Sequence, residues 1–183
     1  MTRHERAVHG FTLTELLVTL AIAGILAMIG APAMGGLLAR TRDASTEAAV
    51  ANTLRHARSA AIMRNTRVLV CPSRDGLRCN PGDDWQHGWL IALDSDHDGQ
   101  PDTNAPLIAA QAPMPVGTRV TTSAGRGQLA FHPNGGAGGS NASFTICHAN
   151  ARAGKAVIVA NSGRVRLASA DAAHLQACLA GIP

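Results

Sequence analysis

Two arginines near the end of the chain have a spacing that suits phosphate groups. Gly163-Arg164-Val165-Arg166 follows Asn161 and Ser162, which are typical turn residues. If the turn joins two strands, alternation places both guanidinium groups on one face, roughly 7 Å apart, or about two nucleotide steps along one DNA strand. A guanidinium binds phosphate well because it presents paired donors on a weakly hydrated charge. Taken alone, however, the residues favour an ordinary solvated sheet edge.

The remaining basic residues of the last part of the chain add to this charge. From Thr103 onward there are six basic residues and one acidic residue, Asp171, whereas Asp75 to Asp102 holds seven acidic residues and one arginine. This asymmetry predicts one basic face that meets a polyanion. Tryptophan and phenylalanine are few, so we expect contacts with the nucleic-acid backbone rather than base stacking. The secondary candidates for these contacts are Arg119, Arg126, Arg152 and Lys155. The alternative for each of them is an ordinary surface charge.

An acidic segment, Asp94-Ser95-Asp96-His97-Asp98-Gly99, imitates the first half of a calcium loop, with alternating oxygen donors and a glycine at the sixth position. The twelfth position is Ala105 instead of a bidentate glutamate. We therefore favour a plain acidic turn and predict no metal site.

The four cysteines, Cys71, Cys79, Cys147 and Cys178, allow three disulfide pairings. We favour Cys71 with Cys79, which closes a short loop, and Cys147 with Cys178, which ties the chain end to an interior strand. Zinc is the competing interpretation, but there is no Cys-x-x-Cys and the histidines are scattered. No G-x-S-x-G, Walker lysine motif or H-E-x-x-H occurs, so we predict no enzyme and no cofactor, with an anchored secreted enzyme as a remote alternative.

The candidate residues above must be positioned by helices and strands. The first of these elements is an apolar helix. Residues 10–39 hold one ionisable side chain, Glu15. As a helix, the uncharged part from Leu16 to Leu38 is about 35 Å long, enough for a hydrocarbon core of ~30 Å. Arg3 and Arg6 precede it, so the leader should stay in the cytoplasm. The rest of the chain is then periplasmic, beyond a single inner-membrane span, where disulfides persist.

A second helical segment and several strands should follow. Pro32 should weaken or kink the first helix. Residues 40–66 should form an amphipathic helix, whose arginines, Arg55 and Arg58 among them, should face solvent. Its apolar stripe comprises Ala44, Ala48, Ala51, Leu54, Ala57 and Ala61.

The rest of the chain should consist of strands and loops. Residues 133–142 are predicted to form a mobile loop. Candidate strands are 68–71, 89–93, 107–111, 118–122, 128–132, 143–147, 156–160 and 164–167. This order predicts an α+β fold with one or two antiparallel sheets. Its predicted parts are a leader (1–10), a transmembrane half of the helix (11–39), an amphipathic half of the helix (40–66) and a β-rich head domain (67–183).

The start of the apolar run has a specific pattern. Gly10-Phe11-Thr12-Leu13, with Glu15 and the following helix, resembles the class III signal of type IV pilins and type II secretion pseudopilins. The resemblance implies a prepilin peptidase that cuts between Gly10 and Phe11 and methylates the Phe11 amine. It also implies that Glu15 pairs with the Phe11 amine of a neighbouring subunit. The alternative is that Glu15 merely reaches the lipid headgroups.

The later part of the chain resembles the GspH/FimT group of minor pilins and pseudopilins. The residues that carry the resemblance are Cys71-Pro72-Ser73, Cys79, Trp85, Gly88-Trp89, the Asp94 to Gly99 turn, Phe131 to Gly135, Phe144 to Cys147 and Asn161 to Arg164. It implies a pilin fold, in which a helical stalk packs on a β-rich head, and a low-copy place in a filament of other pilin subunits.

Within this group, FimT-type minor pilins carry a C-terminal Gly-Arg-x-Arg motif implicated in DNA binding, which Gly163 to Arg166 match. The resemblance therefore favours a minor pilin that binds double-stranded DNA during natural transformation. The alternative is a structural minor pilin, or a GspH-type pseudopilin of type II secretion, that contacts only other subunits.

Overall fold

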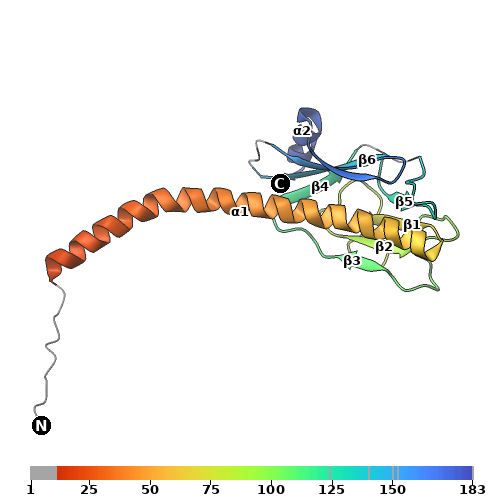
Figure 1. The fold of residues 1–183 in the computed structure, drawn as a ribbon, viewed down its shortest axis with the longest axis horizontal. Helices are drawn as coiled ribbons and strands as arrows, with labels where there is room; N and C mark the ends of the chain where they lie inside the picture. Colours follow the sequence, from red (N-terminus) through yellow and green to blue (C-terminus); the bar gives the residue numbers. More distant parts are fainter. Residues whose placement is uncertain (1–11, 124, 140, 150, 152, 183) are drawn as a thin grey trace, which may run out of the picture. The chain divides into compact units, whose positions relative to one another are not determined.

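The computed structural model describes residues 12–123, 125–139, 141–149, 151 and 153–182, without the side chains of 31–33 and 35–40 (Figure 1). The chain divides into two compact units, Met1–Thr41 and Arg42–Pro183. The predicted leader, residues 1–10, and Phe11 lie outside the described residues.

Helix α1 runs from Leu13 to Arg64. Its first turn is capped by Thr12, whose hydroxyl accepts a hydrogen bond from the Glu15 backbone N–H at 3.3 Å. The helix continues through Pro32, where the sequence predicts a weakened or kinked segment, without a break; apolar membrane-type helices tolerate proline in this way. Leu13–Gly30 is long and apolar enough to cross a membrane. Its large apolar side chains are exposed, as a lipid-facing surface requires.

The second part of α1 belongs to the second unit, where one face is buried. The buried positions are Thr46, Val50, Ala51, Leu54, Ala57, Ala60 and Ala61. Ala44 and Ala48, which the sequence pattern places on this stripe, are exposed. The prediction was wrong there because alanine is a good helix former on either face and does not mark burial by itself.

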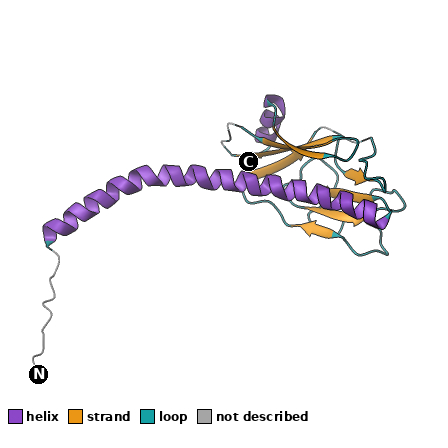
Figure 2. Ribbon diagram, in the orientation of Figure 1, coloured by secondary structure: helices purple, strands orange, loops and turns teal. Residues whose placement is uncertain are grey.

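Two four-stranded antiparallel sheets lie in the second unit (Figure 2). Sheet A has the order β3-β2-β1-β5 and sheet B the order β4-β6-β7-β8. The strands are β1 (Val68–Pro72), β2 (Trp89–Leu93), β3 (Ala109–Gln111), β4 (Thr118–Thr122), β5 (Leu129–Phe131), β6 (Ala142–His148), β7 (Lys155–Val159) and β8 (Val165–Ser169). All eight predicted strands are present, and the sheets and the helix together form the α+β fold expected from the sequence.

The main core lies between the buried face of α1 and one face of each sheet. Leu54 of the helix, Val70 of sheet A and Val157 of sheet B all belong to it. Trp85 packs edge-on against Phe144, with ring centroids 4.9 Å apart. Trp85 and Trp89 are both buried, so neither indole is available to stack on a nucleic-acid base.

A short helix that was not predicted from the sequence, α2 (Ala172–Ala180), packs against β6 and β4. Its N-cap is Asp171, whose carboxylate accepts from the backbone N–H of His174 at 2.9 Å. This bond, and then the His174 side chain, hold the pKa of Asp171 below its usual range. The other face of the helix contributes Leu175 and Cys178 to a small apolar cluster with Cys147.

Residues 133–137 form a structured turn, although the sequence predicts a mobile loop for 133–142. The His132 N–H donates to the Gly136 carbonyl at 2.9 Å, and the Ala137 N–H donates to the Asn161 carbonyl at 2.9 Å. Ala137 is fully buried. This turn therefore lies directly against the loop between β7 and β8.

Candidate nucleic-acid interface

The two predicted arginines lie on a tight hairpin between β7 and β8. The Gly163 N–H donates to the Ala160 carbonyl at 2.7 Å, and the Ala160 N–H donates to the Arg164 carbonyl at 3.0 Å. Strand β8 begins at Val165. Arg164 therefore precedes the strand, whereas the sequence predicts that Arg164 is its first residue. Arg166 pairs with Ile158 in the ladder, and Val165 packs against the core. Both arginine side chains are exposed.

Gly163 is fixed by close packing as well as by its backbone conformation. Its φ is +75°, a left-handed value that favours glycine. A Cβ atom at this position would lie 1.8 Å from the Gly135 carbonyl oxygen. The hairpin and the 133–137 turn can approach this closely only because residue 163 has no side chain.

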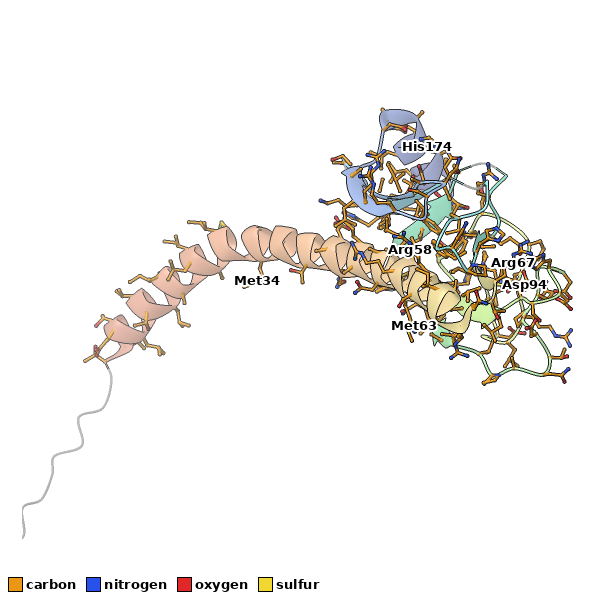
Figure 3. All side chains as sticks on the ribbon, turned by 45° about the vertical axis from the view of Figure 1, so that its right-hand side comes forward. Met34, Arg58, Met63, Arg67, Asp94 and His174 are labelled. Carbon is orange, nitrogen blue, oxygen red and sulfur yellow. A yellow bond between two sulfur atoms is a disulfide. The ribbon has the colours of Figure 1, made fainter. Side chains whose placement is uncertain are left out.

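Arg58, on α1 (Figure 3), holds these two loops from the helix side. Its Nε donates to the Gly135 carbonyl at 3.0 Å and its Nη2 to the Ser162 carbonyl at 3.4 Å. The helical pattern instead places Arg58 on a solvated face. The sequence has no local signal for the role of Arg58, because the two carbonyls come from segments 77 and 104 residues away.

The surface around the hairpin carries positive charge without acidic partners. Among the described residues, no carboxylate lies within 4.0 Å of the guanidinium groups of Arg55, Arg58, Arg164 or Arg166. Arg55 bonds instead to the neutral Asn52 Oδ1, at 3.3 Å. Arg55, Arg58 and Arg164 line one groove, and these three residues together with Arg166, on the adjoining strand β8, are the candidate site.

The structure places three of the secondary candidates away from the hairpin turn. Arg119 lies on β4, and Arg126 follows it; β4 and β8 are opposite edges of sheet B, three inter-strand steps or roughly 14 Å apart. The Arg119 side chain is only 16% exposed and lies 3.9 Å from Asp84. Lys155 lies at the far end of the hairpin ladder, 3.9 Å from Glu47. Arg152 lies outside the described residues.

The acidic turn is held together within the chain. Asp94, Asp96 and Asp102 have carboxylate oxygens within 4.8 Å of one another. Asp94 is fully buried and lies 3.2 Å from Arg67, while its Oδ1 accepts from the Gly99 N–H at 3.3 Å. Asp102 accepts from the Ser95 hydroxyl at 2.7 Å. The buried carboxylate thus already has a cationic partner, as in a structural turn.

Two disulfides join Cys71 to Cys79 and Cys147 to Cys178, which is the pairing favoured from the sequence. Glu15 is exposed in the first turn of α1, where a carboxylate also interacts favourably with the helix dipole. Its predicted partner, the Phe11 amine, lies outside the described residues, so its role in assembly stays a prediction.

A head of two antiparallel sheets against a long helix, whose first part is exposed and apolar, is the architecture of a pilin. The Pseudomonas aeruginosa PAO1 type IV minor pilin FimU has a similar fold, with a TM-score of 0.58 and 19% identity over 72% of this chain and 92% of FimU. EpsH, a minor pseudopilin of the Vibrio cholerae type 2 secretion system, gives a TM-score of 0.51 and 14% identity over 70% of this chain and 97% of EpsH.

Sequence families identify the chain more closely. Residues 48–163 match the family of type II transport protein GspH, and residues 6–31 match the prokaryotic N-terminal methylation motif. The chain therefore belongs to the GspH family and is a minor pilin or pseudopilin. Comparison with curated protein sequences finds no significant match. The GspH match ends at Gly163, so Arg164 and Arg166 lie directly beyond it.

Proposed function

We propose that this pilin binds double-stranded DNA without sequence preference through Gly163, Arg164 and Arg166, and that it serves DNA uptake in natural transformation. The observation that carries the proposal is the exposed pair of arginines with no acidic partner among the described residues, on a hairpin held by Arg58. Contacts from such side chains go to phosphates, and they position the duplex without reading its bases.

The test is binding of the full-length chain, in neutral detergent, to a random-sequence duplex labelled for fluorescence anisotropy. We expect Arg164→Gln with Arg166→Gln to abolish most binding at low salt. The slope of log affinity against log salt should also flatten by about 0.9 for each phosphate that the variant no longer binds.

The matched control is Arg74→Gln with Arg78→Gln. These two exposed arginines lie in the Cys71–Cys79 loop, and their replacement removes the same total charge. The control should bind as the wild type does. Undiminished binding by the hairpin variant would eliminate Arg164 and Arg166 as the site.

A structural role in a filament without DNA is the second candidate, because the chain belongs to a family described as type II transport proteins. A deletion strain separates the two roles. Lost DNA uptake with normal secretion and normal piliation supports the proposal, whereas lost secretion with normal uptake supports the pseudopilin role. Neither role calls for catalysis or a cofactor.

We further propose that prepilin peptidase removes residues 1–10 and methylates Phe11, and that the mature chain stays in the inner membrane until it joins a pilus or pseudopilus. The methylation-motif match over residues 6–31 and the apolar segment Leu13–Gly30 support this. The proposed role of Glu15 is to pair with the Phe11 amine of a neighbouring subunit.

A further inference from the structure

A shallow groove of about 360 Å³ runs between α1 and the start of β8. Its walls come from two parts of the chain that are about a hundred residues apart in sequence. The helix contributes Arg55, Arg58, Ser59 and Ile62, and the hairpin contributes Arg164 and Val165. Both walls therefore carry arginine, above a floor that is partly apolar.

The three arginines of the groove have different tasks. Arg58 uses its Nε and Nη2 donors on the Gly135 and Ser162 carbonyls, so it is a positioning residue. Arg55 is exposed, and among the described residues its guanidinium bonds only to a neutral amide. Arg164 is exposed, and no side-chain partner for it is found among the described residues. Arg55 and Arg164 thus retain most of their donors for a ligand.

The charge of the groove favours an anion. Like charges that share one site repel each other, and a bound anion relieves that repulsion. The planar donor fork of a guanidinium matches the oxygen atoms of a phosphate. The groove volume is near the low end of the range for small-ligand pockets, ~300–1,000 Å³, and so suits one unit of a nucleic-acid backbone.

We propose that this groove is a phosphate subsite, in which Arg55 of α1 and Arg164 of the hairpin bind a backbone phosphate of DNA together. The inference rests on the proposed function and extends the binding surface from the hairpin onto the helix. Arg55 then contacts the ligand directly, whereas Arg58 acts by fixing the hairpin.

The test measures duplex affinity of the full-length chain in neutral detergent over a series of salt concentrations, for Arg55→Gln and for Arg42→Gln. Both are exposed arginines of α1, and glutamine has nearly the same helix propensity as arginine. We expect Arg55→Gln to weaken binding at low salt and to flatten the salt slope by about 0.9, the value for one phosphate. Arg42→Gln should leave that slope unchanged.

Three results would overturn the inference. Wild-type affinity and slope in Arg55→Gln, alongside abolished binding in the Arg164/Arg166 double variant, would remove the groove but keep the proposed function. Equal decreases in Arg55→Gln and Arg42→Gln would reduce the effect to net charge. A wild-type chain that binds no duplex, but binds phosphatidylglycerol vesicles in an Arg55-dependent way, would assign the groove to lipid phosphate and end both proposals.

Discussion

Single residues set the geometry of the basic hairpin. The Gly-Arg-x-Arg pattern places the two charges, but its glycine has a task that the sequence does not reveal. Gly163 lies so close to the Gly135 carbonyl that a side chain cannot fit. Sequence reasoning identifies a turn residue at 163, whereas the packing against residue 135 depends on how two loops meet in the folded chain.

We predict that Gly163→Ala destabilises the head more than Gly117→Ala. Both glycines have left-handed φ values, +75° and +82°, so each substitution should cost about 1–2 kcal/mol for backbone conformation. A Cβ at Gly117 meets nothing within 4 Å, whereas at Gly163 it meets a carbonyl oxygen. The measurement is the midpoint of urea unfolding. Only Gly163→Ala should also reduce duplex affinity, and equal effects of the two variants would contradict this account.

The surroundings of Arg55 and Arg58 also depend on how distant parts of the chain meet in the folded protein. The sequence predicts a solvated helix face for both residues, which is correct for the exposed Arg55 but not for Arg58, whose guanidinium bonds to two loops. A helical pattern does not say which loop lies beside a given turn. The groove that they share with Arg164 is a product of tertiary packing. For this reason Arg164 and Arg166 of the candidate site were predicted from the sequence, whereas Arg55 and Arg58 were not.

At the scale of elements, strands were predicted better than helices. The runs at 89–93 and 118–122 match β2 and β4 in their bounds, because turn residues flank both runs. Helix α2 escaped prediction because it is short and only Leu175 and Cys178 of its residues are buried, too few for a clear helical period. Its available signals were the capping residue Asp171 and the glycine at its end, Gly181.

We expect the two disulfides to contribute unequally to stability. Cys147–Cys178 spans 31 residues and Cys71–Cys79 spans 8. The chain-entropy model gives about 3.5–4 kcal/mol for the longer loop and about 2.5 kcal/mol for the shorter one. Replacing each pair by serines, one pair at a time, should lower the urea midpoint more for the longer loop.

Circular dichroism on the same variants shows whether the loss of a disulfide unfolds α2. Removal of Cys147–Cys178 should release α2 and reduce the helical signal, since this bond joins α2 to β6. Removal of Cys71–Cys79 should leave that signal unchanged. A larger midpoint shift for the shorter loop would contradict the loop-length argument.

At the scale of the whole molecule, the pilin class could be predicted from the sequence because its signals are local. A glycine-phenylalanine step, a glutamate and an apolar run lie within one continuous stretch, and the methylation motif covers them. The proposed binding surface, by contrast, combines a helix with a hairpin that follows it about a hundred residues later.

We predict that the chain isolated from cells with an active prepilin peptidase begins at Phe11 and carries one added methyl group. Intact-mass spectrometry of the detergent-extracted protein measures both changes. In a strain without the peptidase, the mass should be higher by residues 1–10 and lower by one methyl group. A mature chain that still contains residues 1–10 would contradict the proposed processing.

The position of β8 at one edge of sheet B has a consequence for solubility. An edge strand offers unpaired main-chain groups to other molecules, and charged side chains on it discourage strand addition and aggregation. Arg166 lies on this edge and Arg164 beside it, so the charges proposed to attract DNA also keep the heads apart. Glutamine at both positions removes that protection, so self-association of the double variant, detectable by sedimentation, would mimic a loss of affinity.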